Sequence, residues 1–418
     1  MRKAALALAG ALVWPMPVSA QPTPVMLTLQ QAVARVQVSG FDVRMAQDDA
    51  TAAAADAALA RSSLRPQLSV SGNLLDANEP QLGMPIARQA YGAASISIPL
   101  STPSDALRAR EANDTSRAAQ TSALGTANDA VFAAVLAYRN VQLEESVLAA
   151  RHAAVADEQT HLRFTEERVT AGKAARYLIL RDRAALAAAQ QAEEDAAAAH
   201  DQAAYDLEAM LDLNQGPIAL EPLQQATYND SRGAVLARAL RQRPSIIEAQ
   251  QRVAAARAGI AAAQTAYRPS AILTAQSYNG SSSPYLGGGG GQVQITASLP
   301  IADGGSRAAA LAEARAHYDR AIAARDQARA VTIRDAADAW REYQAATRNL
   351  TTATAALTDA QEQLRLASLR QNAGKGIELE ILDALSVAAN AREAIERSIV
   401  RYDIAVAAIH HAAGDVSS

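Results

Sequence analysis

Two glycine–lysine pairs are the patterns in this chain that come closest to a ligand-binding motif. Gly172-Lys173 and Gly374-Lys375 could suggest loops that bind phosphate. A phosphate loop also needs an earlier glycine at a fixed spacing and a serine or threonine after the lysine, and both pairs lack these residues. We therefore interpret the two pairs as turns between helices.

The chain has one histidine pair, His410-His411, and no cysteine. Adjacent residues on a helix point about 100° apart, which disfavours a metal ion shared by the two rings. The lack of cysteine excludes disulfides, thiolate metal sites and cysteine nucleophiles. No other group of residues has the spacing of a catalytic triad, so we expect no enzyme, no metal site and no cofactor.

The composition indicates closely packed helices rather than ordinary globular cores. Half of the 418 residues are hydrophobic, yet only 4% are aromatic, so alanine supplies most of the apolar share. Alanine favours helices and buries little area per residue, which requires close contact between them. The formal net charge of -4 and the lack of a basic patch argue against nucleic acid as a partner.

Residues 1–20 have the pattern of a secretory signal peptide. Arg2 and Lys3 precede a short apolar stretch, and Val18-Ser19-Ala20 resembles a cleavage site. The apolar stretch is about half of the ~20 residues that a membrane-spanning helix needs. We expect an exported protein of the bacterial envelope whose mature chain begins near Gln21.

The mature sequence is a tandem duplication. The segment "SSLRPQLSV" (62–70) matches "TAYRPSAIL" (265–273), and "TAGKAARYLIL" (170–180) matches "NAGKGIELEIL" (372–382), both with an offset close to 202. We predict a first repeat over residues 21–212, an inter-repeat linker over 213–233 that breaks the periodicity, and a second repeat over 234–418.

Each repeat predicts a helix, a β-hairpin, a very long helix, a tight turn and a returning helix. We expect strands near 66–75, 91–100, 269–278 and 292–301, and each successive pair should form a hairpin. We expect the long helices over about 103–171 and 303–373. The first helix of each repeat ends at an Arg-Pro pair, because proline cannot continue a helix. At 1.5 Å per residue, the long helices would extend for about 100 Å.

The long helices carry a coiled-coil seam. In the second repeat, Tyr343, Leu350, Leu357 and Leu364 recur every seven residues, with an alanine three places after each. The matching seam of the first repeat has Arg151 and Glu158 among the positions that are alanine in the second, so it is less uniform. Gly172 and Gly374 would cap the long helices and reverse the chain, which gives two helical hairpins.

The predicted strands alternate apolar and polar residues, and each is about ten residues long, which suits a tilted crossing of a bilayer. In "QVQITASLP" (292–300), Val293 and Ile295 would face lipid. Four strands cannot close a barrel, and unpaired strand edges cannot face lipid, so several chains must share one barrel. A small soluble sheet that caps a coiled coil is the alternative interpretation.

The chain resembles the TolC-type outer-membrane efflux channels. The resemblance covers the mature chain and depends on the duplicated order of elements, the Arg-Pro strand entries and the two hairpin tips, "ERVTAGKAARYLIL" and "LRQNAGKGIELEILDAL". It implies a mainly α fold with a small β part: tandem-duplicated helical hairpins forming a trimeric periplasmic α-barrel, topped by a 12-stranded transmembrane β-barrel with four strands per chain.

The resemblance also implies a function and partners. The chain would be a homotrimer in the outer membrane with a large periplasmic part, and a passive exit duct that works with a periplasmic adaptor and an inner-membrane pump. Gly172, Lys173, Gly374 and Lys375 at the hairpin tips would contact the adaptor. The exported substrate is not visible in the sequence.

The resemblance places a channel constriction at the second tip. Asp383 follows the tip glycine by nine residues, and Glu380 lies one helical turn before it; Asp182 is the counterpart in the first repeat. Three symmetry-related acids would favour cations and could be blocked by multivalent ones. Gly376 stands where the family often has a second polar or cationic gate residue, so the lock of the closed tip is expected to differ.

A periplasmic coiled-coil adaptor, or an envelope scaffold without channel activity, is the alternative function. An adaptor would also contain a helical hairpin, but here the hairpin occurs twice and no separate β-rich domains flank it. An adaptor or scaffold would not conduct ions.

Overall fold

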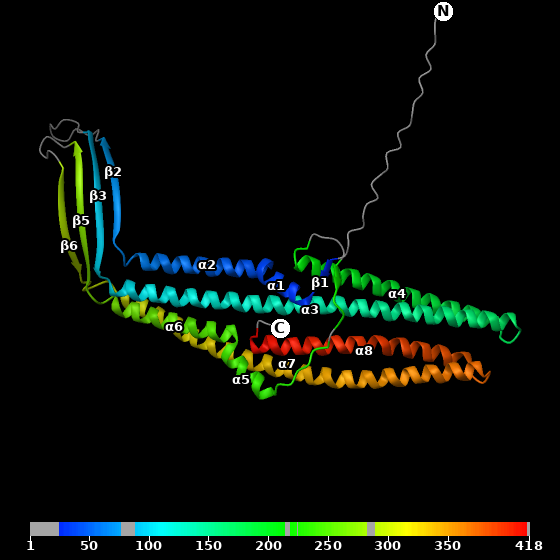
Figure 1. The fold of residues 1–418 in the computed structure, drawn as a ribbon. Coiled ribbons are helices and arrows are strands. Elements are labelled where there is room, and N and C mark those ends of the chain that lie inside the picture. Colours follow the sequence, from blue (N-terminus) through cyan, green and yellow to red (C-terminus); the bar gives the residue numbers. More distant parts are fainter. Residues whose placement is uncertain (1–24, 77–87, 214–217, 224, 282–288, 416–418) are drawn as a thin grey trace, which may run out of the picture.

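The computed structural model describes residues 25–76, 88–213, 218–223, 225–281 and 289–415. The expected signal peptide, residues 1–20, lies outside these ranges. The described chain is an elongated bundle of helices with a four-stranded sheet at one end and two helical hairpins at the other (Figure 1).

The elements of the first half recur in the same order in the second half. The first half contains β1 (Val25–Leu27), α1 (Leu29–Ser39), α2 (Phe41–Ser62), β2 (Gln67–Asp76), β3 (Arg88–Ser101), α3 (Pro103–Thr170) and α4 (Tyr177–Met210). The second half contains β4 (Ile218–Leu220), α5 (Arg232–Gln242), α6 (Pro244–Thr265), β5 (Ser270–Ser281), β6 (Gly290–Ser298), α7 (Ser306–Asn372) and α8 (Glu378–Ala413). Helices α5 and α6 repeat α1 and α2 with both ends displaced by 203 residues.

Two helices precede the β-hairpin in each half, where the sequence predicted one helix. The chain leaves the helical conformation at Gly40 and at Arg243, whose ψ angles are 129° and 124°. Arg243 precedes Pro244, and proline forces its predecessor into an extended conformation. At Gly40 a β-carbon would lie 2.6 Å from the carbonyl oxygen of Val36, so the close turn requires glycine.

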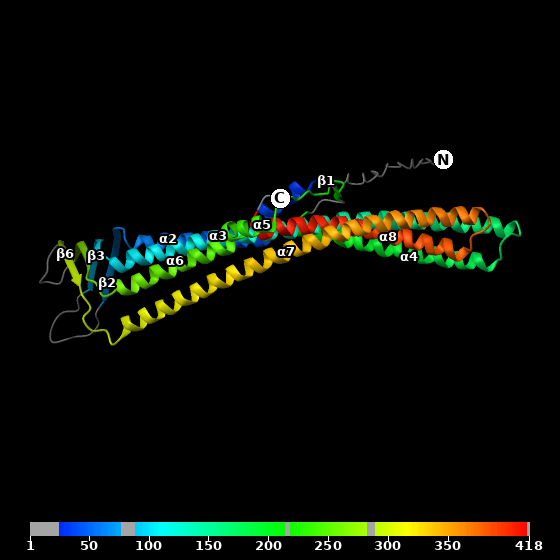
Figure 2. The ribbon, with the colours of Figure 1, turned by 90° about the horizontal axis from the view of Figure 1, so that it is seen from below.

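The two long helices, α3 and α7, have 68 and 67 residues, which corresponds to about 100 Å each. Both run from the sheet to a hairpin tip. Near the sheet they lie in a layer in the order α2, α3, α6, α7; toward the tips the order becomes α4, α3, α8, α7 (Figures 1 and 2). The interrupted helices therefore meet at mid-height, which we call the junction.

The junction contains the largest buried side chains of the molecule. Leu207 and Leu211 at the end of α4 pack with Tyr138 of α3 and with Leu27 of β1. The Tyr138 hydroxyl donates a hydrogen bond to the Leu27 carbonyl oxygen at 2.9 Å. Strand β1 pairs in parallel with β4, which lies in the expected linker, so the linker is tied to the start of the first half.

The seam predicted on the long helix of the second repeat lies at the contact between α7 and α8. Ala346, Ala360 and Ala367 are buried there, and Ala346 packs with Tyr402 and Val406 of α8. Small side chains at these positions allow the two helices to approach closely.

Strand β3 contains Pro99 and ends one residue beyond the expected strand, which covered about 91–100. It reaches Ser101, with an irregular register between Pro99 and Ser101. Proline lacks the N–H group that a regular ladder needs, and a bulge absorbs this loss.

Candidate functional site

The sheet has one apolar face, and its register shows how the four strands build it. The strand order is β2-β3-β5-β6, and all neighbours are antiparallel. Residues opposite each other carry side chains on the same face. One row across the sheet joins Leu68, Ile96, Ala275 and Val293, and a second joins Ile98, Leu273 and Ile295. Strand β5, whose alternation is weakest in the sequence, contributes apolar side chains to both rows.

The opposite face is polar. One row joins Ser69, Ser95, Gln276 and Gln292, and another joins Gln67, Ser97, Thr274 and Gln294. The Oγ atoms of Ser69 and Ser95 are 2.8 Å apart and share a hydrogen bond. The sheet therefore has the two contrasting faces that a wall between lipid and water requires.

Both edges of the sheet are open in the part of the chain that the structure describes. Strand β2 pairs only with β3, and β6 pairs only with β5. The apolar side chains on these edge strands are the most exposed of the sheet: Val70 is 80% exposed and Val293 is 73% exposed. Open edges of this kind can pair with further strands.

The two hairpin tips use the same glycine turn. Gly172 and Gly374 have φ angles of 71° and 70°, in the left-handed region that glycine tolerates. The Lys173 N–H donates to the Arg168 carbonyl at 2.8 Å, and the Lys375 N–H donates to the Arg370 carbonyl at 2.9 Å. These bonds close the last helical turn, and both lysine side chains are exposed.

Gly376 gives the second tip a feature that the first lacks. Its N–H also donates to the Arg370 carbonyl at 2.9 Å, and a β-carbon at this position would lie 2.8 Å from the Gln371 backbone nitrogen. The residue in the matching position of the first tip is Ala174. The glycine that departs from the family pattern is therefore required by the close packing of the backbone.

Asp383 and Glu380 lie together in a groove between α7 and α8. Asp383 is exposed and accepts a hydrogen bond of 3.5 Å from Gln363. Glu380 forms an ion pair with Arg370, with 3.3 Å between Oε2 and Nε. Asp359 and Glu362 of α7 line the same groove. The groove is therefore acidic and contains one arginine.

Asp182, the counterpart of Asp383 in the first repeat, is in a different environment. Its exposed fraction is 0%, and its Oδ2 lies 3.6 Å from Nε2 of the buried His161 in α3. The flanking Arg183 forms an ion pair with Glu166 at 3.0 Å. Asp182 therefore lies inside the first hairpin and does not face an open groove within this chain.

Ion pairs between α3 and α8 connect the two hairpins, and the sequence analysis missed them. Arg151 pairs with Glu393, and Arg392 pairs with Asp157 at 2.8 Å. Burial in the same region raises the pKa of Glu158; nearby His161 lowers it, and Asp182 and Asp157 raise it further. Arg151 and Glu158 are two of the three charged residues that interrupt the seam of the first repeat. This interruption was the signal in the sequence that could have pointed to the ion pairs.

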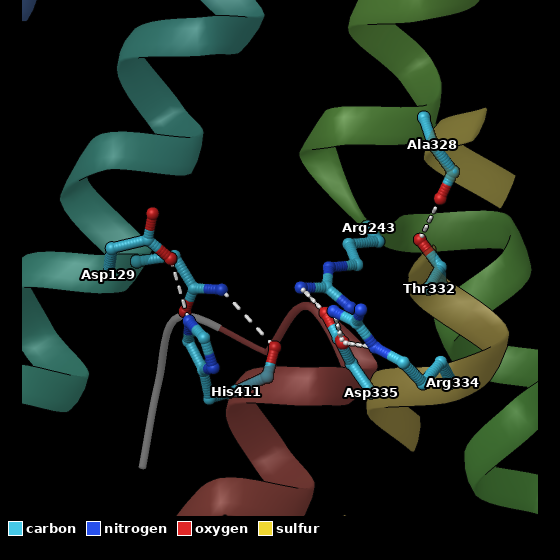
Figure 3. Close-up of polar contacts among 8 residues, drawn as sticks. Asp129, Arg243, Ala328, Thr332, Arg334, Asp335 and His411 are labelled. Atoms are coloured by element: carbon cyan, nitrogen blue, oxygen red, sulfur yellow. Dashed lines mark hydrogen bonds and ion pairs between the residues drawn. The ribbon is translucent and has the colours of Figure 1, made fainter. Parts of the chain in front are cut away.

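His410 and His411 have separate partners at the junction. His411 Nε2 lies 2.7 Å from Asp129 Oδ1 of α3, and the His411 carbonyl accepts from Asn128 (Figure 3). His410 Nδ1 lies 3.5 Å from Asp415 Oδ2. His411 therefore connects the end of α8 to α3, and His410 pairs with a residue just beyond the end of its own helix.

Arg243 forms the neighbouring polar contact of the junction. Its Nη2 donates to Asp335 Oδ2 of α7 at 2.8 Å, and Arg334 donates to the other carboxylate oxygen at 2.9 Å (Figure 3). Burial alone would raise the pKa of Asp335. The hydrogen bonds from Arg334 and Arg243 outweigh burial and keep the pKa of this carboxyl below its usual value.

No group of three or more histidine, cysteine or acidic residues among the described residues has the geometry of a metal site. None of the helices in the described ranges is both long and apolar enough to cross a membrane.

Residues 235–415 match the family model described as outer membrane efflux protein. Outer membrane protein OprJ of Pseudomonas aeruginosa is 34% identical over 150 residues, which are 35% of this chain and 31% of the relative. The match therefore spans about a third of that relative's length. Together these findings confirm that part of the chain resembles outer membrane efflux proteins.

Solved structures with similar folds cover nearly the whole chain. CusC, whose structures are described in terms of folding and transmembrane channel formation, has a TM-score of 0.82 at 19% identity and covers 98% of this chain and 99% of its own. The CmeC outer membrane channel of Campylobacter jejuni has a TM-score of 0.81 at 17% identity, covering 99% and 93%. The open MtrE channel of Neisseria gonorrhoeae has a TM-score of 0.79 at 20% identity, covering 93% and 91%. The fold of this chain is the one that these channels share.

Proposed function

We propose that three copies of the chain form the exit duct of a tripartite efflux or secretion system. Two findings support this: residues 235–415 match the family model of outer membrane efflux proteins, and nearly the whole chain has the fold of solved outer-membrane channels. An inner-membrane pump would deliver the substrate through a periplasmic adaptor. The chain would act as a passive conduit, with the energy supplied by the pump.

The main support for this proposal is that the sheet has two open edges and two contrasting faces. Strand β2 of one copy would pair with β6 of the next, so that three chains build a barrel of twelve strands without an open edge. The rows that contain Leu68 and Ile98 would face lipid, and the rows that contain Ser69 and Gln67 would face water.

The helices would continue the barrel as a periplasmic tunnel. Four helices lie side by side at each level of the described chain, so three chains would place twelve around the tunnel. The outermost helices, α2 and α7 near the sheet and α4 and α7 near the tips, would contact the neighbouring copies.

The hairpin tips would hold the gate and the adaptor contact. Asp383 and Glu380 would contribute to an acidic ring at the closed end. Asp182 would stabilise the first hairpin from inside rather than line the passage, because it is buried against His161. The exposed turns at Gly172-Lys173 and Gly374-Lys375 would meet the adaptor.

Two measurements on the purified mature protein test the duct. We expect it in the outer-membrane fraction, extracted only by detergent, with the mass of a trimer and with stepwise conductance in a planar bilayer. A water-soluble monomer without affinity for lipid would overturn the proposal, and a lipid-bound protein that does not conduct would favour a scaffold. Deletion of the gene, followed by exposure to antibiotics, detergents and metal salts, would then indicate the substrate class.

The shared barrel can be tested separately because the chain contains no native cysteine. Single cysteines introduced along β2 and β6 should form cross-links between chains when they are combined in one protein, and each should stay uncrosslinked alone. Cross-links up to a covalent trimer would support pairing of the two edges. Their absence across the whole panel would contradict it.

A further inference from the structure

The boundary between the helices and the sheet, which we call the collar, exposes apolar side chains at matching positions of both halves. Leu64 and Tyr267 follow α2 and α6, and Leu100 and Ile301 each follow a proline at the end of a hairpin. All four are exposed, and Ile301, at 90%, is the most exposed large apolar side chain among the described residues. The collar therefore extends the apolar surface of the sheet toward the helices.

The register of the strands places these positions at one end of the sheet. Gln67, the first residue of β2, is opposite Ser97 of β3, and Ser270, the first residue of β5, is opposite Ser298, the last residue of β6. The ends of α2 and α6 thus adjoin the last residues of β3 and β6, all at the end of the sheet that meets the helices (Figure 1).

Arg65 and Arg268 are cations of the collar, and they belong to the two Arg-Pro pairs of the sequence. The prolines explain why the helices end, but they do not explain why an arginine precedes each of them. Both side chains are exposed, and no residue in the described ranges forms an ion pair or a side-chain hydrogen bond with either guanidinium group. Each half therefore presents one uncompensated positive charge at the collar.

The acids of the adjoining turns already have partners. Asp303 pairs with Arg307 at 2.6 Å, and Asp105 pairs with Arg108 at 3.7 Å. The Arg307 guanidinium also lies 4.4 Å from the centre of the Tyr267 ring, which holds this ring at the collar. The two arginines of the Arg-Pro pairs are thus available to an anion from outside the chain.

We propose that the collar binds anionic phospholipids. The phosphate of one lipid would pair with Arg65 and that of a second with Arg268, and the acyl chains would continue along the apolar face of the sheet. Guanidinium groups bind phosphate through two parallel hydrogen bonds, a geometry that lysine lacks. The proposal rests on the proposed duct function, which puts the sheet in a membrane, and it names a lipid partner that the duct itself does not require.

A phospholipid fits both properties of the collar in one molecule. Its headgroup supplies the negative charge that the arginines lack, and its acyl chains remove exposed apolar side chains from water. A free phosphate ion would satisfy the arginines and leave Leu100 and Ile301 in water. The rows that contain Leu68 and Ile98 begin next to the collar, so the apolar contact is continuous.

The test measures lipid binding to the mature protein in detergent by native mass spectrometry, with phosphatidylglycerol and phosphatidylcholine of identical acyl chains. We expect the protein to retain phosphatidylglycerol in preference. Arg65→Gln and Arg268→Gln should each weaken phosphatidylglycerol binding by ~5-fold, as expected for one basic residue beside an anionic headgroup, and leave phosphatidylcholine binding unchanged. Arg268→Lys keeps the charge without the paired hydrogen bonds, so its affinity should lie between those of wild type and Arg268→Gln.

Two control variants make the test specific. Arg315→Gln removes an exposed arginine of α7 that forms no ion pair within the described ranges, and it should bind both lipids as the wild type does. Ile301→Ser should weaken the binding of both lipids and keep the preference between them, because it removes an apolar contact and no charge.

Several outcomes would overturn the proposal. These are equal retention of the two lipids, wild-type binding of phosphatidylglycerol in the variant that carries both arginine-to-glutamine changes, an equal loss in Arg315→Gln, and unchanged lipid binding in Ile301→Ser. Displacement of phosphatidylglycerol by inorganic phosphate would indicate a phosphate site rather than a lipid site. Lower thermal stability of the arginine variants with unchanged lipid binding would assign Arg65 and Arg268 to the dipoles of α2 and α6 alone.

The outcome is separable from that of the duct itself. Conductance of the wild-type protein tests the duct, and lipid preference tests the collar. A conducting trimer without a preference for phosphatidylglycerol would refute the lipid site alone, and a protein that does not conduct would refute the duct.

Discussion

Arg35 donates from Nε to the carbonyl oxygen of Leu211 at 2.7 Å, across 176 residues of sequence. Its Nη2 also donates to the Asp212 carbonyl at 3.0 Å. The last carbonyls of a helix have no partner within the helix and carry its negative dipole end, so α1 supplies a cationic cap to α4. In the second half, Arg238 holds the matching position and pairs with Asp415, just beyond α8, at 3.0 Å.

Replacement of this cap should loosen the junction. We expect Arg35→Ala to lower the free energy of unfolding by ~1 kcal/mol, since it removes two charge-assisted hydrogen bonds to partly exposed carbonyls. Hydrogen exchange should accelerate in the last turn of α4 and in α1. Arg44→Ala, at an exposed position of α2 without a described partner, is the control; equal exchange in the two variants would contradict the capping role.

The second hairpin tip should not tolerate a side chain at position 376. Gly376→Ala would place a β-carbon 2.8 Å from the Gln371 nitrogen, and we expect a cost of about 1–3 kcal/mol from the forced displacement of the backbone. Limited proteolysis should cut the second tip faster than in the wild type. The reverse change in the first tip, Ala174→Gly, is the matched comparison, and similar rates for both variants would refute the packing argument.

Asp383 should contribute to multivalent-cation block of the channel. It is exposed in an acidic groove, so its charge is available to ions, whereas Asp182 is buried. Asp383→Ala should relieve block by a trivalent cation in single-channel recordings, and Asp182→Asn should leave the block close to the wild-type value. Unchanged block in Asp383→Ala would remove this residue from the gate.

The ion pairs between α3 and α8 should couple the two hairpins. A double-mutant cycle on Arg151 and Glu393 is expected to give a coupling energy of ~0.5–1 kcal/mol, because both side chains are partly exposed to water. The readout is protection against hydrogen exchange in the tip half of α8. Additive effects of the two single variants would show that the pair does not hold the hairpins together.

Acidification should stabilise the packing around Glu158. Its pKa in the folded protein is raised by burial, so the folded state binds the proton more tightly than the unfolded state. The associated stability is fully present below the ordinary glutamate pKa and is lost as the pH rises through the raised value. Glu158→Gln should therefore gain stability relative to wild type at neutral pH and gain little at acidic pH.

Unfolding by urea, measured as a function of pH, tests this effect. Glu167→Gln changes an exposed acid of the same helix and should follow the wild-type pH dependence. A Glu158→Gln profile parallel to that of the wild type would contradict the burial argument.

The long helices and their turns could be predicted because their signals are local. Proline stops the helices before the strands, the positive φ at Gly172 and Gly374 requires glycine, and the seam of the second repeat follows from a seven-residue period. The apolar face of the sheet could be predicted for the same reason, since alternation along one strand fixes which side chains share a face.

The environments of the acids near the tips could not be predicted, since burial depends on contacts between distant segments. Asp182 and Asp383 are equivalent in the repeat, yet the first is buried against His161 and the second is exposed. Similarly, Arg151 marks an interruption of the seam, but the sequence does not show that Glu393, 242 residues later, supplies its partner. Duplication preserved the positions of these residues and not their neighbours.

Of the eight helices in the described chain, α3 and α7 alone are unbroken from the sheet to the tips. The others end or begin at mid-height, where side-chain caps and short hydrogen bonds replace continuous backbone. In the proposed trimer, torque applied by an adaptor at the hairpins would reach the strands through six unbroken helices, the α3 and α7 of each copy, and the interrupted helices would yield first. The proposed gate at the tips would then open with little disturbance of the strands at the other end.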